Sequence, residues 1–223
     1  MPPILTETEV RVLGCLVEKQ ATTPEYYPLT LNALTLACNQ KNNRQPVMSL
    51  NESAVMEAVE SLREKNLVYI FYGSNSRVPK YKHVMPEILH LGTPELALMC
   101  VLMLRGAQTV GELRERASRL YEFPGLEETE ETLNSLSRKD ADTEPLVARL
   151  PRQAGQKEAR FVHLLSGELD LEALAELEAS PHASTSRQSS SDRITQLEQQ
   201  VETLSGQIKN LQDEFAAFKK QFE

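Results

Sequence analysis

One short polar stretch brings together basic and amide side chains of the kind that contact nucleic acids. It consists of Lys41, Asn42, Asn43, Arg44 and Gln45. Lysine and arginine bind phosphate oxygens, whereas asparagine and glutamine hydrogen-bond to the edges of bases. Further along the first half of the chain come three more basic residues, Arg77, Lys80 and Lys82. We predict that all of these side chains form a basic edge that contacts nucleic acid.

The same stretch has a plainer interpretation, which the sequence leaves open. Asparagine side chains often hydrogen-bond to neighbouring backbone groups and complete the ends of helices. On that interpretation residues 39–45 form a polar loop that binds no ligand. Contact with nucleic acid and this structural role are therefore both hypotheses for the stretch.

The charge distribution does not exclude a nucleic-acid partner for the first part of the chain. The whole chain has a net charge of −8, which is unfavourable for a protein that coats DNA. Residues 1–85, however, carry nine Lys and Arg against eight Asp and Glu. Residues 166–223 carry five against eleven, so the acidity is concentrated in the C-terminal part.

The sequence contains no pattern of residues that is typical of an enzyme. We find no glycine-rich phosphate-binding loop, no metal-ligand cluster and no nucleophile elbow. Cys15, Cys38 and Cys100 each lie in an apolar helical pattern and are expected to be buried thiols. His83 and His163 occupy equivalent positions of a repeated unit, which favours a structural contact over catalysis. We therefore expect no enzymatic activity, no cofactor and no metal.

The elements that must position these residues form an approximate internal repeat. In the first copy, Thr6 and Glu9 form a capping-box pattern before an apolar run at helical spacing. Two helices and two strands follow, at Thr30–Asn39, Asn51–Lys65, Leu67–Phe71 and Lys80–His83. The second copy begins with Thr93 as a cap before Pro94. Its later elements are expected at Thr109–Leu120, Leu126–Lys139, Leu146–Leu150 and Arg160–Leu164.

Three helices followed by a β-hairpin is the order of a winged helix-turn-helix. We therefore predict a mainly α fold with small β-hairpins (α+β), with two tandem winged helix-turn-helix domains and a C-terminal coiled-coil helix. The two domains are expected at residues 1–88 and 89–167. Residues 168–191 are expected to form a short acidic helix and a Ser-rich flexible linker, and residues 192–223 the coiled coil.

The C-terminal segment repeats apolar residues at alternating spacings of three and four. This dimerisation stripe consists of Ile194, Leu197, Val201, Leu204, Ile208, Leu211, Phe215, Phe218 and Phe222. β-Branched residues at position a with leucine at position d favour a parallel two-stranded coil, so we expect a homodimer. A helix that docks its stripe on its own chain or on another protein is the alternative.

The third helices of the two copies differ in how well they suit nucleic acid. In a winged helix this element enters the major groove of DNA. The first one carries glutamates that repel phosphates, but Asn51 and Ser53 at its N-terminal end suit base contacts. The second begins with carboxylates that would face the phosphates, namely Glu127, Glu128, Glu130 and Glu131. We expect DNA contact from the first domain and a protein partner for the second.

Four stretches of the chain are distinctive in sequence. They are residues 28–34 (PLTLNAL), 37–48 (ACNQKNNRQPVM), 104–114 (LRGAQTVGELR) and 150–158 (LPRQAGQKE). Through them the chain resembles the YceH-like family of uncharacterised bacterial proteins. The resemblance covers residues from Leu5 to Leu165, so the linker and the coil lie outside it. It implies a pair of winged-helix domains in a cytoplasmic bacterial protein, and no established activity.

The leading hypothesis is a non-enzymatic regulatory or DNA-binding-like adaptor, held as a dimer by its C-terminal coil. The competing hypothesis is a protein–protein interaction scaffold that binds no nucleic acid. No apolar run is long enough to span a membrane, and the N-terminus lacks the pattern of a signal peptide. We therefore expect a cytoplasmic location and no membrane partner.

Overall fold

The computed structural model of the chain describes residues 3–72, 78–138, 144–152 and 158–167. The predicted acidic helix, linker, coiled coil and dimerisation stripe lie outside these residues, and so does Arg77. Within the described ranges, no helix is both long enough and apolar enough to cross a membrane.

The first half contains helices, short strands and one 3-10 turn. Their bounds are α1 (Glu7–Thr22), η1 (Pro24–Tyr26), β1 (Leu29–Thr30), α2 (Leu31–Cys38), α3 (Glu52–Glu64), β2 (Val68–Phe71) and β3 (Lys80–His83). α1 begins at the predicted capping box, in which the Thr6 hydroxyl accepts from the Glu9 N–H and the Glu9 carboxylate accepts from the Thr6 N–H. α3 begins after Asn51, whose side-chain oxygen accepts from the N–H of Ala54. The helices predicted at these positions are confirmed.

The strands of the first half form an antiparallel sheet in the order β1-β3-β2. Across β2 and β3, Tyr69 lies opposite Lys82, and Phe71 lies opposite Lys80. Because successive side chains of a strand point to opposite faces, these residues share the outer face of the sheet. The inner face presents Val68, Ile70, Tyr81 and His83. β1 was not predicted, since its 2 residues are too few to show an alternation.

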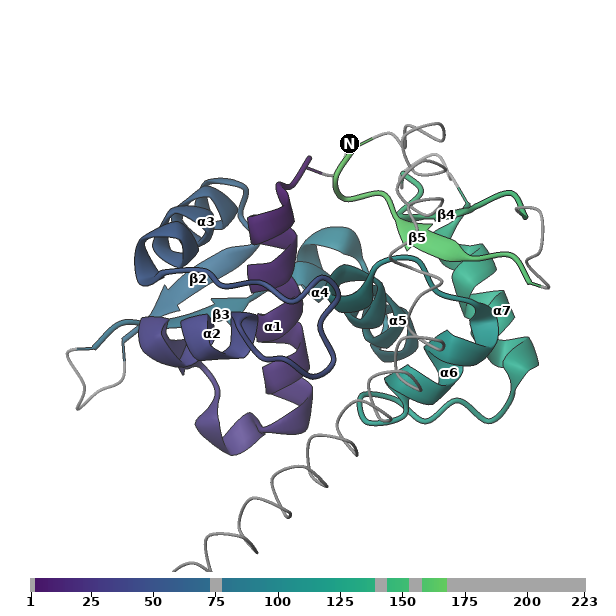
Figure 1. Ribbon diagram of the computed structural model, residues 1–223, viewed down its shortest axis with the longest axis horizontal. Helices are drawn as coiled ribbons and strands as arrows, with labels where there is room; N and C mark the ends of the chain where they lie inside the picture. Colours follow the sequence, from purple (N-terminus) through teal and green to yellow (C-terminus); the bar gives the residue numbers. More distant parts are fainter. Residues whose placement is uncertain (1–2, 73–77, 139–143, 153–157, 168–223) are drawn as a thin grey trace, which may run out of the picture. The chain divides into compact units, whose positions relative to one another are not determined.

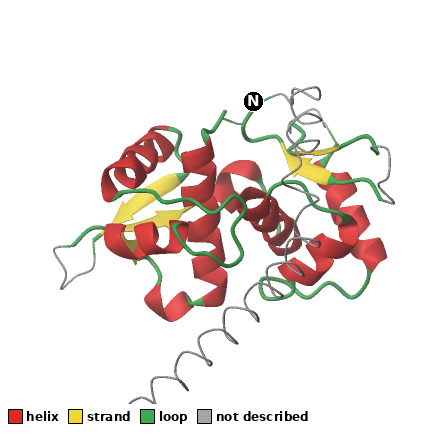
Figure 2. Ribbon diagram, viewed as in Figure 1, coloured by secondary structure: helices red, strands yellow, loops and turns green. Residues whose placement is uncertain are grey.

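The second half repeats the order of helices followed by a strand pair (Figure 2). Its elements are α4 (Met85–Leu89), α5 (Thr93–Arg105), α6 (Val110–Ala117), α7 (Leu126–Leu136), β4 (Val147–Arg149) and β5 (Phe161–His163). The start of α5 differs from the prediction, because Gly92 is its N-cap and Thr93 is already helical. The carboxylate of Glu95 supplies the capping hydrogen bond by accepting from the Gly92 N–H at 2.8 Å.

α1 and α5 lie side by side at the centre of the described body (Figure 1). A Cβ built on Gly14 of α1 would lie 2.9 Å from the Cδ2 of Leu104, so glycine permits this close approach. The Sγ of Cys100 in α5 lies 3.5 Å from the carbonyl oxygen of Gly14. The two predicted domains thus share a buried contact, and their exact boundaries stay a prediction.

The fold class is confirmed in its coarse form, as a mainly helical α+β body with small antiparallel sheets. One core includes side chains from both halves, among them Leu13 and Leu34 of the first and Leu98 and Leu113 of the second. The thiols of the three cysteines are buried and unpaired, as their apolar helical surroundings predicted.

Candidate nucleic-acid interface

Arg44 does not lie on the surface, which corrects its predicted role as a phosphate contact. Its side chain is 0 % exposed, and its Nη2 lies 2.6 Å from the carboxylate of Glu18 in α1. The same guanidinium donates to the carbonyl oxygens of Ala37 and Asn43. A buried charge is costly unless it is paired and hydrogen-bonded, and these acceptors satisfy that need. Arg44 therefore links the loop after α2 to α1 in the interior of the protein.

The loop that contains Arg44 joins the two halves of the molecule. The N–H of Gln45 donates to the carbonyl oxygen of Leu104 at 2.8 Å, and Arg105 donates to the side-chain oxygen of Asn43. Asn43 has a φ of 60°, a left-handed conformation that asparagine tolerates better than most residues. These contacts hold the loop against the end of α5. The structural interpretation of the stretch therefore accounts for Asn43 and Arg44 without a ligand.

The remaining candidate residues do not form one continuous basic edge. Lys41, Asn42 and Gln45 are exposed in the loop that reaches toward α5, whereas Lys80 and Lys82 lie on β3. In Figure 1 the β2–β3 end of the first half points away from α5. The loop and the strand lysines must therefore be considered as separate surfaces.

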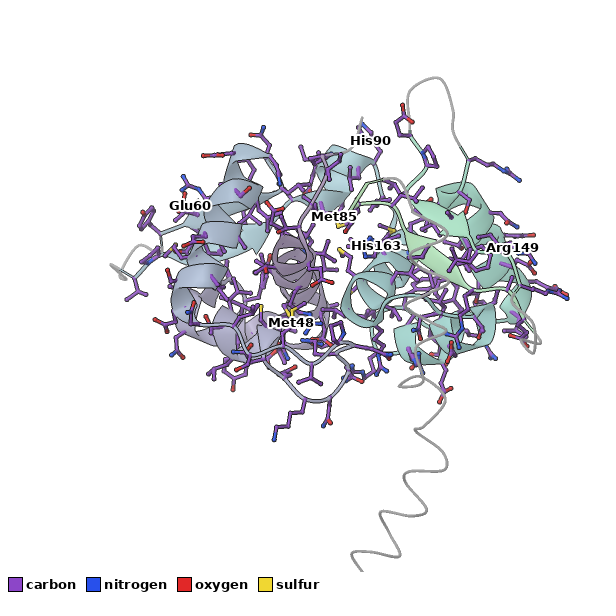
Figure 3. The ribbon with its side chains drawn as sticks, turned by 45° about the horizontal axis from the view of Figure 1, so that its top comes forward. Met48, Glu60, Met85, His90, Arg149 and His163 are labelled. Atoms are coloured by element: carbon purple, nitrogen blue, oxygen red, sulfur yellow. The ribbon has the colours of Figure 1, made fainter. Side chains whose placement is uncertain are left out.

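The solvent-facing side of α3 is acidic. Its exposed carboxylates include those of Glu52, Glu57 and Glu64. Glu60 also lies on the outside of the helix (Figure 3), where it accepts from Arg63, the only basic residue in α3. Ser53 at the N-terminal end is exposed, but its hydroxyl lies 3.5 Å from the Glu57 carboxylate. Because phosphates would meet a negative surface here, α3 is poorly suited to enter the major groove.

The second half presents a similar surface. α7 exposes the carboxylates of Glu127, Glu130 and Glu131, and it contains no basic residue. Several arginines of this half are already engaged with neighbours. Arg116 and Arg160 pair with Glu112 at 3.4 and 3.1 Å, and the guanidinium of Arg149 lies 5.9 Å from the centre of the Phe161 ring. The charge on α7 is thus as unfavourable for phosphates as that on α3.

His83 and His163 occupy the same register position in the two strand pairs. His83 lies opposite Val68, and His163 lies opposite Val147. Burial lowers the pKa of each ring to about 4, so both rings are neutral at neutral pH. In the part of the chain that the structure describes, no group of side chains suited to holding a metal ion is present. His163 lies within the body (Figure 3), which favours the structural interpretation of these rings.

Two features of the site were not predicted. Arg11 of α1 is 2 % exposed and donates to the backbone carbonyl of the last residue of α2 and to a second carbonyl in the loop that follows α2. On the outer face of the first sheet, Tyr69 and Phe71 are 47 % and 44 % exposed. The alternation within residues 68–71 is the signal that would have revealed these outward aromatic rings. No local pattern marks Arg11 as buried, because its acceptors lie 27 and 35 residues further along the chain.

In its class, the chain is a mainly helical α+β protein that repeats a unit of helices and a small antiparallel sheet. A family model described as "Protein of unknown function, DUF480" matches residues 5–156. The chain therefore belongs to this family of uncharacterised bacterial proteins, which confirms the YceH-like resemblance.

Similar proteins from several bacteria cover nearly the whole chain. A UPF0502 protein of Geotalea uraniireducens (strain Rf4) is 51% identical over 98% of this chain and 98% of its own length. A UPF0502 protein of Pelobacter propionicus (strain DSM 2379 / NBRC 103807 / OttBd1) is 48% identical over 100% of both chains. A UPF0502 protein of Vibrio campbellii (strain ATCC BAA-1116) is 48% identical over 88% of this chain and 89% of its own. The names of these relatives state no activity, so a function can be inferred only from the sequence and structure of this chain.

Proposed function

We propose that the protein is a non-enzymatic adaptor, built from two winged helices, that binds a positively charged partner protein through the exposed face of α3. The order of elements in the first half supports the winged-helix assignment. α1, β1, α2, α3, β2 and β3 follow one another, and the sheet has the order β1-β3-β2. In a helix-turn-helix protein the recognition helix is left exposed so that it can enter the major groove of DNA. α3 has the same place in the order of elements, and its exposed face is the surface that we assign to the partner protein.

The observation that carries the proposal is the charge on α3. Glu52, Glu57 and Glu64 are exposed, and among the described residues none of the three is paired with a lysine or arginine. Neighbouring members of this set are five and seven residues apart, which is about 7.5 and 10.5 Å along the helix axis. These separations are close to the Debye length of about 8 Å at physiological salt, so the potentials of neighbouring carboxylates add in part. Such a surface steers and orients a basic protein partner and repels a phosphate backbone.

Binding of DNA by the first half is the second candidate. Lys41 favours it, because its exposed ammonium is free to hold a phosphate beside the amides of Asn42 and Gln45. The acidic face of α3 opposes it, and the burial of Arg44 removes one of the cations on which it depended. A regulatory adaptor that contacts duplex DNA is therefore the weaker of the two candidates.

The proposal includes the pairing of two copies through residues 192–223. It rests on the heptad repeat of the dimerisation stripe alone, since those residues lie outside the described ranges. Two acidic faces on one dimer gain avidity for a partner that has two basic sites, provided that both can be reached at once.

A pull-down with the full chain as bait tests the adaptor function. The bait is exposed to a nuclease-treated bacterial lysate at low salt, beside the variant Glu52→Gln/Glu57→Gln/Glu64→Gln, which keeps the shape of α3 and removes its charge. We expect wild type to retain a protein in roughly equimolar amount and the variant to retain about tenfold less.

A matched variant of α7 controls for acidity in general. Glu127→Gln/Glu130→Gln/Glu131→Gln removes the same number of charges from the other acidic helix and is expected to leave retention unchanged. Equal retention by wild type and the α3 variant contradicts the proposal. Retention that is seen only in a parallel lysate without nuclease contradicts it as well, because the bait would then be holding nucleic acid.

A further inference from the structure

The outer face of the β2–β3 pair combines exposed aromatic rings with lysines. Tyr69 and Phe71 are 47 % and 44 % exposed, and the register places Lys82 and Lys80 directly opposite them. Directly opposed residues of an antiparallel pair lie about 5 Å apart at Cβ, on the same face of the sheet. Each aromatic ring therefore has an ammonium-bearing side chain as its cross-strand neighbour.

These lysines are not engaged by the protein itself. Among the described residues, neither Lys80 nor Lys82 is paired with a carboxylate. Neither ammonium lies over an aromatic ring, in contrast to Arg149, whose guanidinium lies over Phe161 in the second half. The outer face thus offers flat apolar rings and unpaired positive charges together.

The second half shows that this face is not needed to build the fold. The matching histidines align Val68 and His83 with Val147 and His163, so the counterparts of Tyr69 and Lys82 are Ala148 and Val162. An alanine and a valine thus stand where the first half has a tyrosine and a lysine. By the same alignment, a leucine and an arginine (Leu150 and Arg160) stand where it has Phe71 and Lys80, so neither exposed aromatic ring has an aromatic counterpart. The pairing of exposed aromatics with lysines is therefore specific to the first half and requires a separate explanation.

We propose that the outer face of β2–β3 binds single-stranded nucleic acid, with Tyr69 and Phe71 stacking on unpaired bases and Lys80 and Lys82 holding the phosphates. Aromatic side chains on a sheet stack on bases of any type, because every base has a π-face. Lysines beside them neutralise the backbone of the same strand.

The chemistry of this face favours a single strand over a duplex. In a duplex the faces of the bases are covered by their neighbours, so exposed tyrosine and phenylalanine rings find no base to stack on. A duplex that entered along the third helix would also meet the carboxylates of Glu57 and Glu64. A flexible single strand can lie on the sheet without following α3. This surface and the acidic face of α3 are separate sites, so either proposal can fail without the other.

Fluorescence anisotropy with the full chain tests this inference. The probes are a labelled poly(dT) strand of about 12 nucleotides, a poly(U) strand of the same length, and a duplex of the same length, each at about 50 mM and about 200 mM salt. We expect both single strands to bind more tightly than the duplex. Tyr69→Ala and Phe71→Ala should each weaken the binding of poly(dT) by about tenfold. Lys82→Gln should lower the slope of log affinity against log salt by about 0.7.

Tyr26→Ala is the matched control, because Tyr26 is a 71 % exposed tyrosine on η1, outside the sheet. It should bind poly(dT) like wild type. Circular dichroism at rising temperature must show that the sheet variants unfold at the wild-type temperature. A folded chain that binds no single strand overturns the inference. Equal affinity for strand and duplex, or unchanged binding by folded Tyr69→Ala and Phe71→Ala, overturns it too.

Discussion

The guanidinium of Arg44 and the carboxylate of Glu18 form an ion pair inside the protein, with 2.6 Å between Nη2 and Oε2 and side-chain exposures of 0 % and 6 %. The other oxygen of Glu18 lies 3.5 Å from Arg119, which follows α6 in the second half. Glu18 is therefore the point at which α1, the loop after α2 and the second half meet. A residue that was predicted to touch nucleic acid instead holds the body together.

Replacing Arg44 should destabilise the fold strongly. Arg44→Met leaves the largely buried carboxylate of Glu18 without its main partner, so we expect the free energy of unfolding to fall by about 3–5 kcal/mol. Urea denaturation followed by circular dichroism measures the change. Arg63→Met is the control, because its pair with Glu60 is exposed and its loss should cost less than about 1 kcal/mol. If both variants lowered the free energy of unfolding by a similar amount, the buried pair of Arg44 would stabilise the fold no more than the exposed pair does.

The contact between α1 and α5 should not tolerate a larger residue at position 14. A Cβ on Gly14 would lie 2.9 Å from Leu104 and 3.2 Å from the Cβ of Met103. We expect Gly14→Ala to lower the free energy of unfolding by about 1–3 kcal/mol through overpacking. Gly111→Ala in α6 meets nothing within 4 Å and should raise it by about 0.5–1 kcal/mol. A stabilising Gly14→Ala would contradict the close approach of the two helices.

The stability of the protein should decrease in mild acid because of His83. Burial lowers the pKa of this ring to about 4, so the folded chain keeps it neutral while the unfolded chain protonates it near pH 6.5. Unfolding takes up a proton between these pH values. The free energy of unfolding should therefore fall by about 1.4 kcal/mol for each pH unit, per buried histidine, as the pH drops from about 6.5 to about 4.

Urea titrations at several pH values check this dependence with a matched pair of variants. His83→Phe removes one of the two buried titrating rings and should lower the slope by about 1.4 kcal/mol per pH unit, while the contribution of His163 stays. His90→Asn is the matched control, because His90 is exposed and its left-handed φ of 53° suits asparagine. An unchanged slope in folded His83→Phe would mean that other groups govern the loss of stability in acid.

The C-terminal heptads should determine the number of copies in the assembly. Light scattering of the full chain should give the mass of two chains, and a variant that ends at Ser191 should give the mass of one. This result follows if the apolar stripe of residues 194–222 is buried only by pairing. A monomeric full chain would show that the stripe docks elsewhere, and a dimeric truncation would place the dimer contact in the body.

The helices of this protein could be predicted because their signals are local. Thr6 and Glu9 lie three residues apart and cap α1 as their spacing predicted, and the 3.6-residue periodicity gave the positions of α2 and α3. The start of α5 was misassigned by one residue, since Glu95 caps the backbone of Gly92 and leaves Thr93 inside the helix. Gly92 and Thr93 are neighbouring candidates for the N-cap of α5, and the sequence alone does not decide between them.

The candidate site was less predictable because its residues depend on distant partners. Arg44 and Glu18 are 26 residues apart, and the loop residue Asn43 meets Arg105 across 62 residues. A polar stretch in a sequence looks the same whether it faces water or another part of the chain. The exposed carboxylates of α3 could be predicted, because charged residues that lie opposite an apolar helical face point to solvent.

Site-specific photocrosslinking tests the central claim, that α3 presents an acidic face to a partner protein, most directly. A photoreactive residue in place of Glu57, near the middle of the exposed face of α3, is irradiated in living bacteria, and the adducts are identified by mass spectrometry. We predict a discrete protein adduct whose yield falls about tenfold when Glu52→Gln and Glu64→Gln are added. An adduct with nucleic acid, or a protein adduct that is insensitive to the loss of these charges, would contradict the account.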